Sequence, residues 1–140
     1  MYPSESGLLA ELMSHVPDIW GENASSAVEV HCHDQAHMDL LITCEGTVIA
    51  VEAKLSHWSR VLAQAYLHRY CADYVYVAIP AHNVTATKLH DAKRFGIGVV
   101  GVSNRATRIV QPAIQAQPEA RIRERLLAFG YRTSCSEGNL

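Results

Sequence analysis

Apolar residues follow helical spacing in some segments of the chain and strand spacing in others. Residues 5–16 place apolar side chains three or four positions apart and end at Pro17, which predicts a first helix. The polar stretch 18–26 predicts a loop. Apolar runs then predict three strands, and a tight turn at Glu45-Gly46 joins the last two into a β-hairpin. We expect these strands at 27–32, 39–44 and 47–54.

The second half of the chain alternates helices with strands. Helices between consecutive strands favour crossover connections, so we expect an α/β fold with a mixed β-sheet flanked by helices. It forms one domain over 1–110, with a linker and C-terminal helix of the same domain at 111–130 and a flexible tail at 131–140. The last helix either joins two copies into a homodimer or covers a face of the sheet. The expected elements are a helix from Ser56 or Ser59 to about Cys71, a strand at 74–79 ended by Pro80, a helix at 85–95 followed by Gly96, a strand at 97–102, a linker at 111–118, and an amphipathic helix at 118–129 that ends near Gly130.

The composition is that of an ordinary globular protein. The chain has 140 residues, of which 49% are apolar and 19% are charged, and this excludes a disordered or fibrous chain. No apolar run approaches the length of a membrane span, and the first residues lack the basic and apolar character of a secretion signal. The four cysteines are widely spaced and form no CxxC pair, so we expect reduced thiols in a cytoplasmic protein.

Charge is unevenly distributed along the chain, although the net charge is only −2. Residues 1–53 hold nine acids and no Lys or Arg, whereas residues 54–140 hold five acids and all 12 bases. The two halves therefore carry −9 and +7. An acidic half can bind a cation and a basic half can bind a polyanion. The alternative is that the halves interleave and give an evenly mixed surface.

Three charged residues interrupt the apolar hairpin. Asp39 opens its first strand, and Glu52 and Lys54 end the second on one face, because strand side chains alternate. The turn returns Asp39 beside Glu52 or Lys54, so two carboxylates and an ammonium meet at one end of the sheet. The carboxylates, with the main-chain carbonyl of Ala53, can hold Mg²⁺ or Mn²⁺, and the lysine can offset charge on a phosphate. The pattern predicts metal-dependent hydrolysis of a phosphodiester bond.

Asp39, followed after twelve residues by Glu52-Ala53-Lys54, resembles the catalytic signature of the PD-(D/E)XK nucleases, which include restriction endonucleases and Holliday-junction resolvases. The resemblance covers residues 5 to about 80 and departs from the motif at Met38, where the motif has a proline. It implies a restriction-endonuclease-like sheet of core order αβββαβ, followed by αβ and a C-terminal helix. It also implies Mg²⁺- or Mn²⁺-dependent cleavage of DNA. Gln64 joins the three charged residues as catalytic, because many members carry a glutamine on this helix.

The resemblance implies further site residues. Members often add an acid from the first helix as a metal ligand, and Glu5 fits this role better than Glu11. Arg60 and His68 share the helical row of Gln64 and could reach phosphate, or else they lie on a solvated helix face. Other phosphate contacts are expected from basic residues of the second half: Lys88, Lys93, Arg94, and Arg105 or Arg108.

Two alternatives to a nuclease follow from the same sequence. His31, His33 and His37 form a dense group of metal donors with Cys32 and Asp34, which predicts a zinc-stabilised interaction protein. A nuclease-like module that binds nucleic acid without cutting it would carry the same charged residues in the hairpin.

Overall fold

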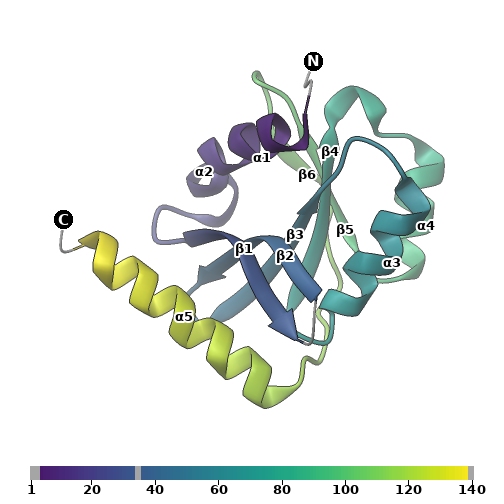
Figure 1. Ribbon diagram of the computed structural model, residues 1–140. Helices are drawn as coiled ribbons and strands as arrows, with labels where there is room; N and C mark the ends of the chain where they lie inside the picture. The colour runs from purple at the N-terminus through teal and green to yellow at the C-terminus, as the bar shows by residue number, and fades with distance from the viewer. Residues whose placement is uncertain (1–3, 34–35, 139–140) are drawn as a thin grey trace.

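The computed structural model describes residues 4–33 and 36–138, and its centre is a six-stranded β-sheet whose strands lie side by side in chain order (Figure 1). The first three strands form an antiparallel meander, the third to fifth are parallel, and the sixth returns antiparallel to the fifth. The expectation of a mixed α/β sheet flanked by helices is confirmed. The strands are β1 (Ser25–His33), β2 (Ala36–Cys44), β3 (Thr47–Ala53), β4 (Tyr74–Pro80), β5 (Gly98–Val102) and β6 (Arg108–Gln111).

Helices cover both faces of the sheet, and each face has its own apolar core. The first two helices pack on one face, around Leu8 and Leu12, and the later ones cover the other face, around Val61 and Leu126 (Figure 1). No helix within the described ranges is long and apolar enough to cross a membrane. The helices are α1 (Glu5–Ser14), α2 (Val16–Trp20), α3 (Trp58–His68), the short 3₁₀ turn η1 (Ala81–Asn83), α4 (Ala86–Arg94) and α5 (Ala120–Gly138).

The hairpin of β2 and β3 takes the register that its sequence predicts. Both residues of the Glu45-Gly46 turn have positive φ, +48° and +81°, as a type I′ hairpin turn requires. Leu40 pairs with Val51 across the two strands. One position beyond this pair lie Asp39 and Glu52, at the end of the sheet away from the turn.

Several elements differ from the predicted ones. The chain stays helical beyond Pro17, as α2, because a proline in the first turn of a helix needs no hydrogen-bond donor. Strand β6 was not expected, since its four residues are partly exposed at the sheet edge and carry no alternating pattern. Helix α3 begins at Trp58 instead of after a serine cap, because His57 takes a left-handed conformation at the N-cap.

Helix α5 continues to Gly138, past Gly130, so its predicted end near Gly130 is wrong. The flexibility of residues 131–140 stays a prediction. Gly130 serves packing here: a Cβ atom at this position would lie 2.3 Å from Oγ1 of Thr43, so glycine allows α5 to cross close to β2. Leu126 of the same helix is fully buried against the sheet. Of its two expected roles, α5 thus takes the covering one, and a homodimer stays a prediction.

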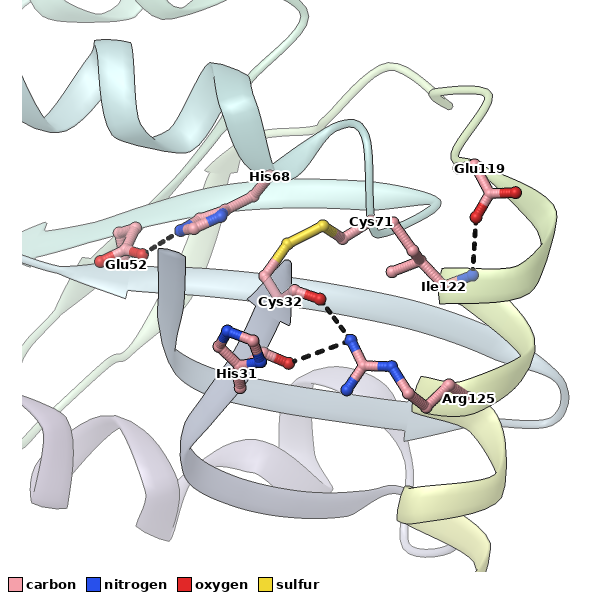
Figure 2. Close-up of a disulfide and its surroundings, with 8 residues drawn as sticks. All are labelled: His31, Cys32, Glu52, His68, Cys71, Glu119, Ile122 and Arg125. Atoms are coloured by element: carbon pink, nitrogen blue, oxygen red, sulfur yellow. Dashed lines mark hydrogen bonds and ion pairs between the residues drawn. A yellow bond between two sulfur atoms is a disulfide. The ribbon is translucent and has the colours of Figure 1, made fainter. Parts of the chain in front are cut away.

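A disulfide joins Cys32 to Cys71, which corrects the expectation that both are reduced thiols. Both cysteines are fully buried, and the bond ties the end of β1 to the segment after α3 (Figure 2). Beside it, Arg125 of α5 donates to the main-chain carbonyl oxygens of His31 and Cys32. The two cysteines lie 39 residues apart in the chain. Only the packing of α3 against the sheet brings them together, so no local spacing indicates the bond.

Candidate functional site

Asp39 and Glu52 lie side by side where the β2–β3 hairpin ends. Oδ2 of Asp39 accepts a hydrogen bond from the main-chain N–H of Ala53 at 2.9 Å. The Asp39 carboxyl also lies close enough to the carboxyl of Glu52 to share a proton with it. The structure therefore brings together the two acids of the expected site, and it does so through the hairpin register.

Burial and the neighbouring acid raise the pKa of Asp39 from 3.8 to about 6. Burial is the largest cause, followed by the hydrogen bond with Glu52 and the negative charge of Glu52. The hydrogen bond from Ala53 and the positive charge of Lys54 act in the opposite direction. A pKa raised in this way indicates negative charge that the surrounding protein balances only in part. Such a pair of acids is a favourable place for a cation.

Glu52 is buried, and its Oε1 is hydrogen-bonded to Nε2 of His68 (Figure 2). Both side chains are almost completely removed from solvent, with His68 only 3% exposed. His68 therefore does not lie on a solvated helix face. It shares the apolar row of α3 with Val61 and Ala65, and this spacing was the signal in the sequence for its burial. Its contact with Glu52 fixes the orientation of the carboxylate.

Lys54 follows β3, and its Nζ lies 3.7 Å from Oε1 of Glu5 on α1. The other oxygen of Glu5 accepts a hydrogen bond from the main-chain N–H of Leu55 at 3.2 Å. Of the two acids considered on the first helix, Glu5 is thus the one that reaches this end of the sheet. Glu11 is hydrogen-bonded to His15 at 3.0 Å instead. Glu5 contacts the lysine, and its role as a metal ligand stays a prediction.

Asp39, Glu52, Lys54 and His68 line an open pocket of about 470 Å³. Its volume is in the range of small-molecule binding sites. Gln64 lines it from the exposed side of α3. His37, which the sequence indicated as a metal donor, also lines it. Nothing in the sequence indicated two further residues of the wall between β2 and α3, Ala36 and Leu67.

The other basic residues expected to bind phosphate lie outside this pocket. Arg60 is exposed on α3, and Lys93 and Arg94 are exposed at the end of α4. Lys88 has a contact within the protein, since its Nζ donates to the main-chain carbonyl oxygen of Asn83 at 3.1 Å. The contacts of these four residues with nucleic acid stay predictions.

The expected zinc cluster loses one donor, because Cys32 is in the disulfide. His31 and His37 are paired on adjacent strands, with their ring centroids 5.1 Å apart. The side chain of His33 and all of Asp34 lie outside the described part of the chain. Within that part, no group of three or more His, Cys, Asp or Glu residues could hold a metal ion.

Comparison with known proteins shows the fold of this chain and no function. No protein-family model and no curated protein matches it. Among solved structures, it is similar to the SPO1766 protein of unknown function from Silicibacter pomeroyi, with a TM-score of 0.68, 15% sequence identity, and coverage of 93% of this chain and 85% of that one. A second structure, Pyrococcus furiosus SfsA in complex with Ca²⁺, matches with a TM-score of 0.37, 15% identity, and coverage of 82% and 62%. The first likeness shows a shared fold, and the second is too weak to support an argument.

Proposed function

We propose that this protein is a metal-dependent nuclease that hydrolyses phosphodiester bonds in DNA on a restriction-endonuclease-like fold. The observation that carries the proposal is the pairing of Asp39 with Glu52, next to Lys54 and inside an open pocket. The order of α1, β1 to β3, α3 and β4, with the short α2 inserted, supports the fold.

The donor set fits a hard divalent cation such as Mg²⁺ or Mn²⁺. Asp39 and Glu52 supply carboxylate oxygens, and the raised pKa of Asp39 indicates charge that a cation would balance. Two acids do not complete a metal site. The carbonyl of Ala53, water and the substrate would supply the other ligands, and Mg²⁺ commonly keeps water and phosphate among its ligands. When bound, the cation would polarise the phosphate and lower the pKa of a bound water.

The remaining residues of the pocket orient the acids and the substrate. Lys54 offsets the negative charge that develops on the phosphate, and Glu5 holds its ammonium group from α1. His68 supports Glu52 from inside the protein. Gln64 lies on the exposed side, where its amide can donate to a phosphate oxygen.

Purified protein should cleave plasmid DNA with Mg²⁺ and should not cleave it with EDTA. Lys54→Met should lower the cleavage rate about 10²- to 10³-fold, the usual loss when one group that stabilises developing charge is removed. Arg121→Met removes an exposed cation from α5 and should cleave like the wild type. Mg²⁺ should also raise the melting temperature by mass action, which gives a second readout without cleavage.

Two other outcomes would identify the alternatives. DNA binding without cleavage in either Mg²⁺ or Mn²⁺ would identify a non-cleaving nucleic-acid-binding module. Zinc could instead co-purify with the protein and stay bound in the Asp39→Asn variant. This result would assign the metal site to His31, His33 and His37. Either result would contradict the proposed activity.

Binding to duplex DNA should weaken steeply as salt rises, because basic residues of the second half meet phosphates. Each neutralised phosphate contributes about −0.9 to the slope of log affinity against log salt. Arg60→Ala should therefore reduce the magnitude of the slope by about 1. Fluorescence anisotropy in EDTA, from low to moderate salt, measures both slopes. An affinity that does not change with salt would exclude DNA as the partner.

A further inference from the structure

A second groove, of about 490 Å³, adjoins the proposed active site along α3. Leu67 lines both this groove and the pocket that holds Asp39 and Glu52, so the two are neighbours on one surface. A chain bound in the pocket can therefore continue into the groove. The other walls come from the end of α3 and from the segment that precedes α5: Tyr66, Arg69, Tyr70, Ala116 and Gln117.

A main-chain hydrogen bond and the close packing of one side chain hold the groove in shape. The N–H of Glu119 donates to the carbonyl oxygen of Tyr70 at 2.8 Å, which attaches the segment before α5 to the end of α3. On the other side, Gly96 leaves room for the guanidinium group of Arg69, since a Cβ atom at Gly96 would lie 3.0 Å from Cζ of Arg69. A ligand would thus meet a preformed surface, which lowers the entropy cost of binding.

The walls of the groove are aromatic and cationic, and none of the described residues that line it is acidic. Tyr66, Leu67 and Tyr70 are 49%, 58% and 53% exposed, unusually high fractions for large apolar side chains. Phe95 packs edge-on against the ring of Tyr66, at 5.6 Å between centroids, and supports it. Nε of Arg69 is buried without a hydrogen-bond partner among the described residues. Exposed rings beside an arginine are the combination that binds unpaired bases and their phosphates.

We propose that this groove binds a single-stranded segment of the DNA substrate, with bases stacked on Tyr66 and Tyr70 and a phosphate near Arg69. The inference rests on the proposed function, because it takes one strand to run from the active-site pocket into the groove. A single strand is favoured over a duplex, since duplex bases are already stacked on one another and leave no face for a tyrosine. The enzyme would then cut next to a flap, an overhang or a melted stretch of duplex, such as supercoiling opens in a plasmid.

Anisotropy of a fluorescent oligothymidylate, measured in EDTA so that nothing is cut, tests the groove. The wild type should bind it more tightly than a duplex of the same length. Tyr66→Ala and Tyr70→Ala should each weaken oligothymidylate binding about 5- to 100-fold, as the loss of one stacking contact does, and should leave duplex binding unchanged. Tyr66→Phe keeps the ring and should bind within about twofold of the wild type. Val28→Ala, at an exposed apolar position on β1, is the matched control.

The groove and the nuclease activity can fail separately. Oligothymidylate binding that depends on both tyrosines, without Mg²⁺-dependent cleavage of any DNA, would support the groove and overturn the nuclease. Normal cleavage, with Tyr66→Ala and Tyr70→Ala binding oligothymidylate like the wild type, would overturn the groove alone. A wild-type dimer that Tyr66→Ala converts to a monomer, with unchanged oligothymidylate binding, would assign the aromatic surface to a second copy of the chain and also overturn the inference.

Discussion

Asp39→Asn is expected to abolish cleavage and to stabilise the folded protein. The carboxylate of Asp39 is one of the two acids that would hold the cation, and an amide binds a hard cation much more weakly. We expect a loss of about 10²- to 10⁴-fold in the cleavage rate. The hydrogen bond from the main-chain N–H of Ala53 can persist, because the amide of asparagine keeps one carbonyl oxygen as an acceptor.

The gain in stability follows from the raised pKa of Asp39. Between 3.8 and about 6, the folded protein keeps a proton on Asp39 that the unfolded chain has already lost. The free energy of unfolding therefore falls as pH rises through this interval, and it stays lowered above it. Asparagine carries no charge at any pH, so Asp39→Asn should recover about 1–2 kcal/mol near neutral pH, after allowance for the partial exposure of Asp39. The melting temperature should rise by about 3–6 °C.

Calorimetry of the wild type and Asp39→Asn, above and below the pKa of about 6, measures this effect. The two melting curves should differ most above that pKa, where Asp39 is ionised. Asp18→Asn is the matched control, because the Asp18 side chain is 76% exposed and lies on α2. If Asp39→Asn lowered both activity and stability, Asp39 would be a structural residue and its assignment to an active site would be wrong.

The part of the site that could be predicted from the sequence is the part that depends on one hairpin. The turn and the apolar run on each side set the register, and the register brings Asp39 next to Glu52. Local rules for strands and turns are sufficient for this step. Contacts between distant elements were harder to predict. Glu5 was placed at the site only through the resemblance, and the contact of His68 with Glu52 was missed because Arg60, Gln64 and His68 were assigned to one polar row.

The distinction between local patterns and contacts of distant elements also explains the errors in the predicted fold. Strands β1 to β5 and helices α1, α3 and α4 have regular apolar spacing, and their existence was predicted. Strand β6 is short and partly exposed, so its pairing with β5 comes from the sheet edge and not from its own pattern. Gly130 looked like a helix end because glycine often stands there. In α5 it is needed for close contact with Thr43, which only the folded structure reveals.

Removing the disulfide should lower the free energy of unfolding more than replacing a free cysteine does. Cys32 and Cys71 close a loop of 39 residues, and the chain-entropy model assigns such a cross-link about 4 kcal/mol. The Cys32→Ala, Cys71→Ala double variant should therefore melt at least about 10 °C below the wild type. Cys44→Ala is the control, because Cys44 is a free cysteine and is only partly buried. A dithiol reductant should lower the melting temperature of the wild type by a similar amount. It should leave the melting temperature of the double variant unchanged.

The disulfide also bears on the proposed active site and on the compartment in which the protein works. Cys71 lies about one turn beyond His68, the partner of Glu52, so the bond holds the end of α3 near the acids. The double variant should therefore lose cleavage at temperatures where the wild type still acts, and it should keep activity well below its own melting point. A cytoplasmic location stays a prediction, and stable disulfides are rare in that compartment. If intact-mass analysis under non-reducing conditions found two free thiols at these positions, and the double variant melted like the wild type, the reduced thiols expected from the sequence would be correct.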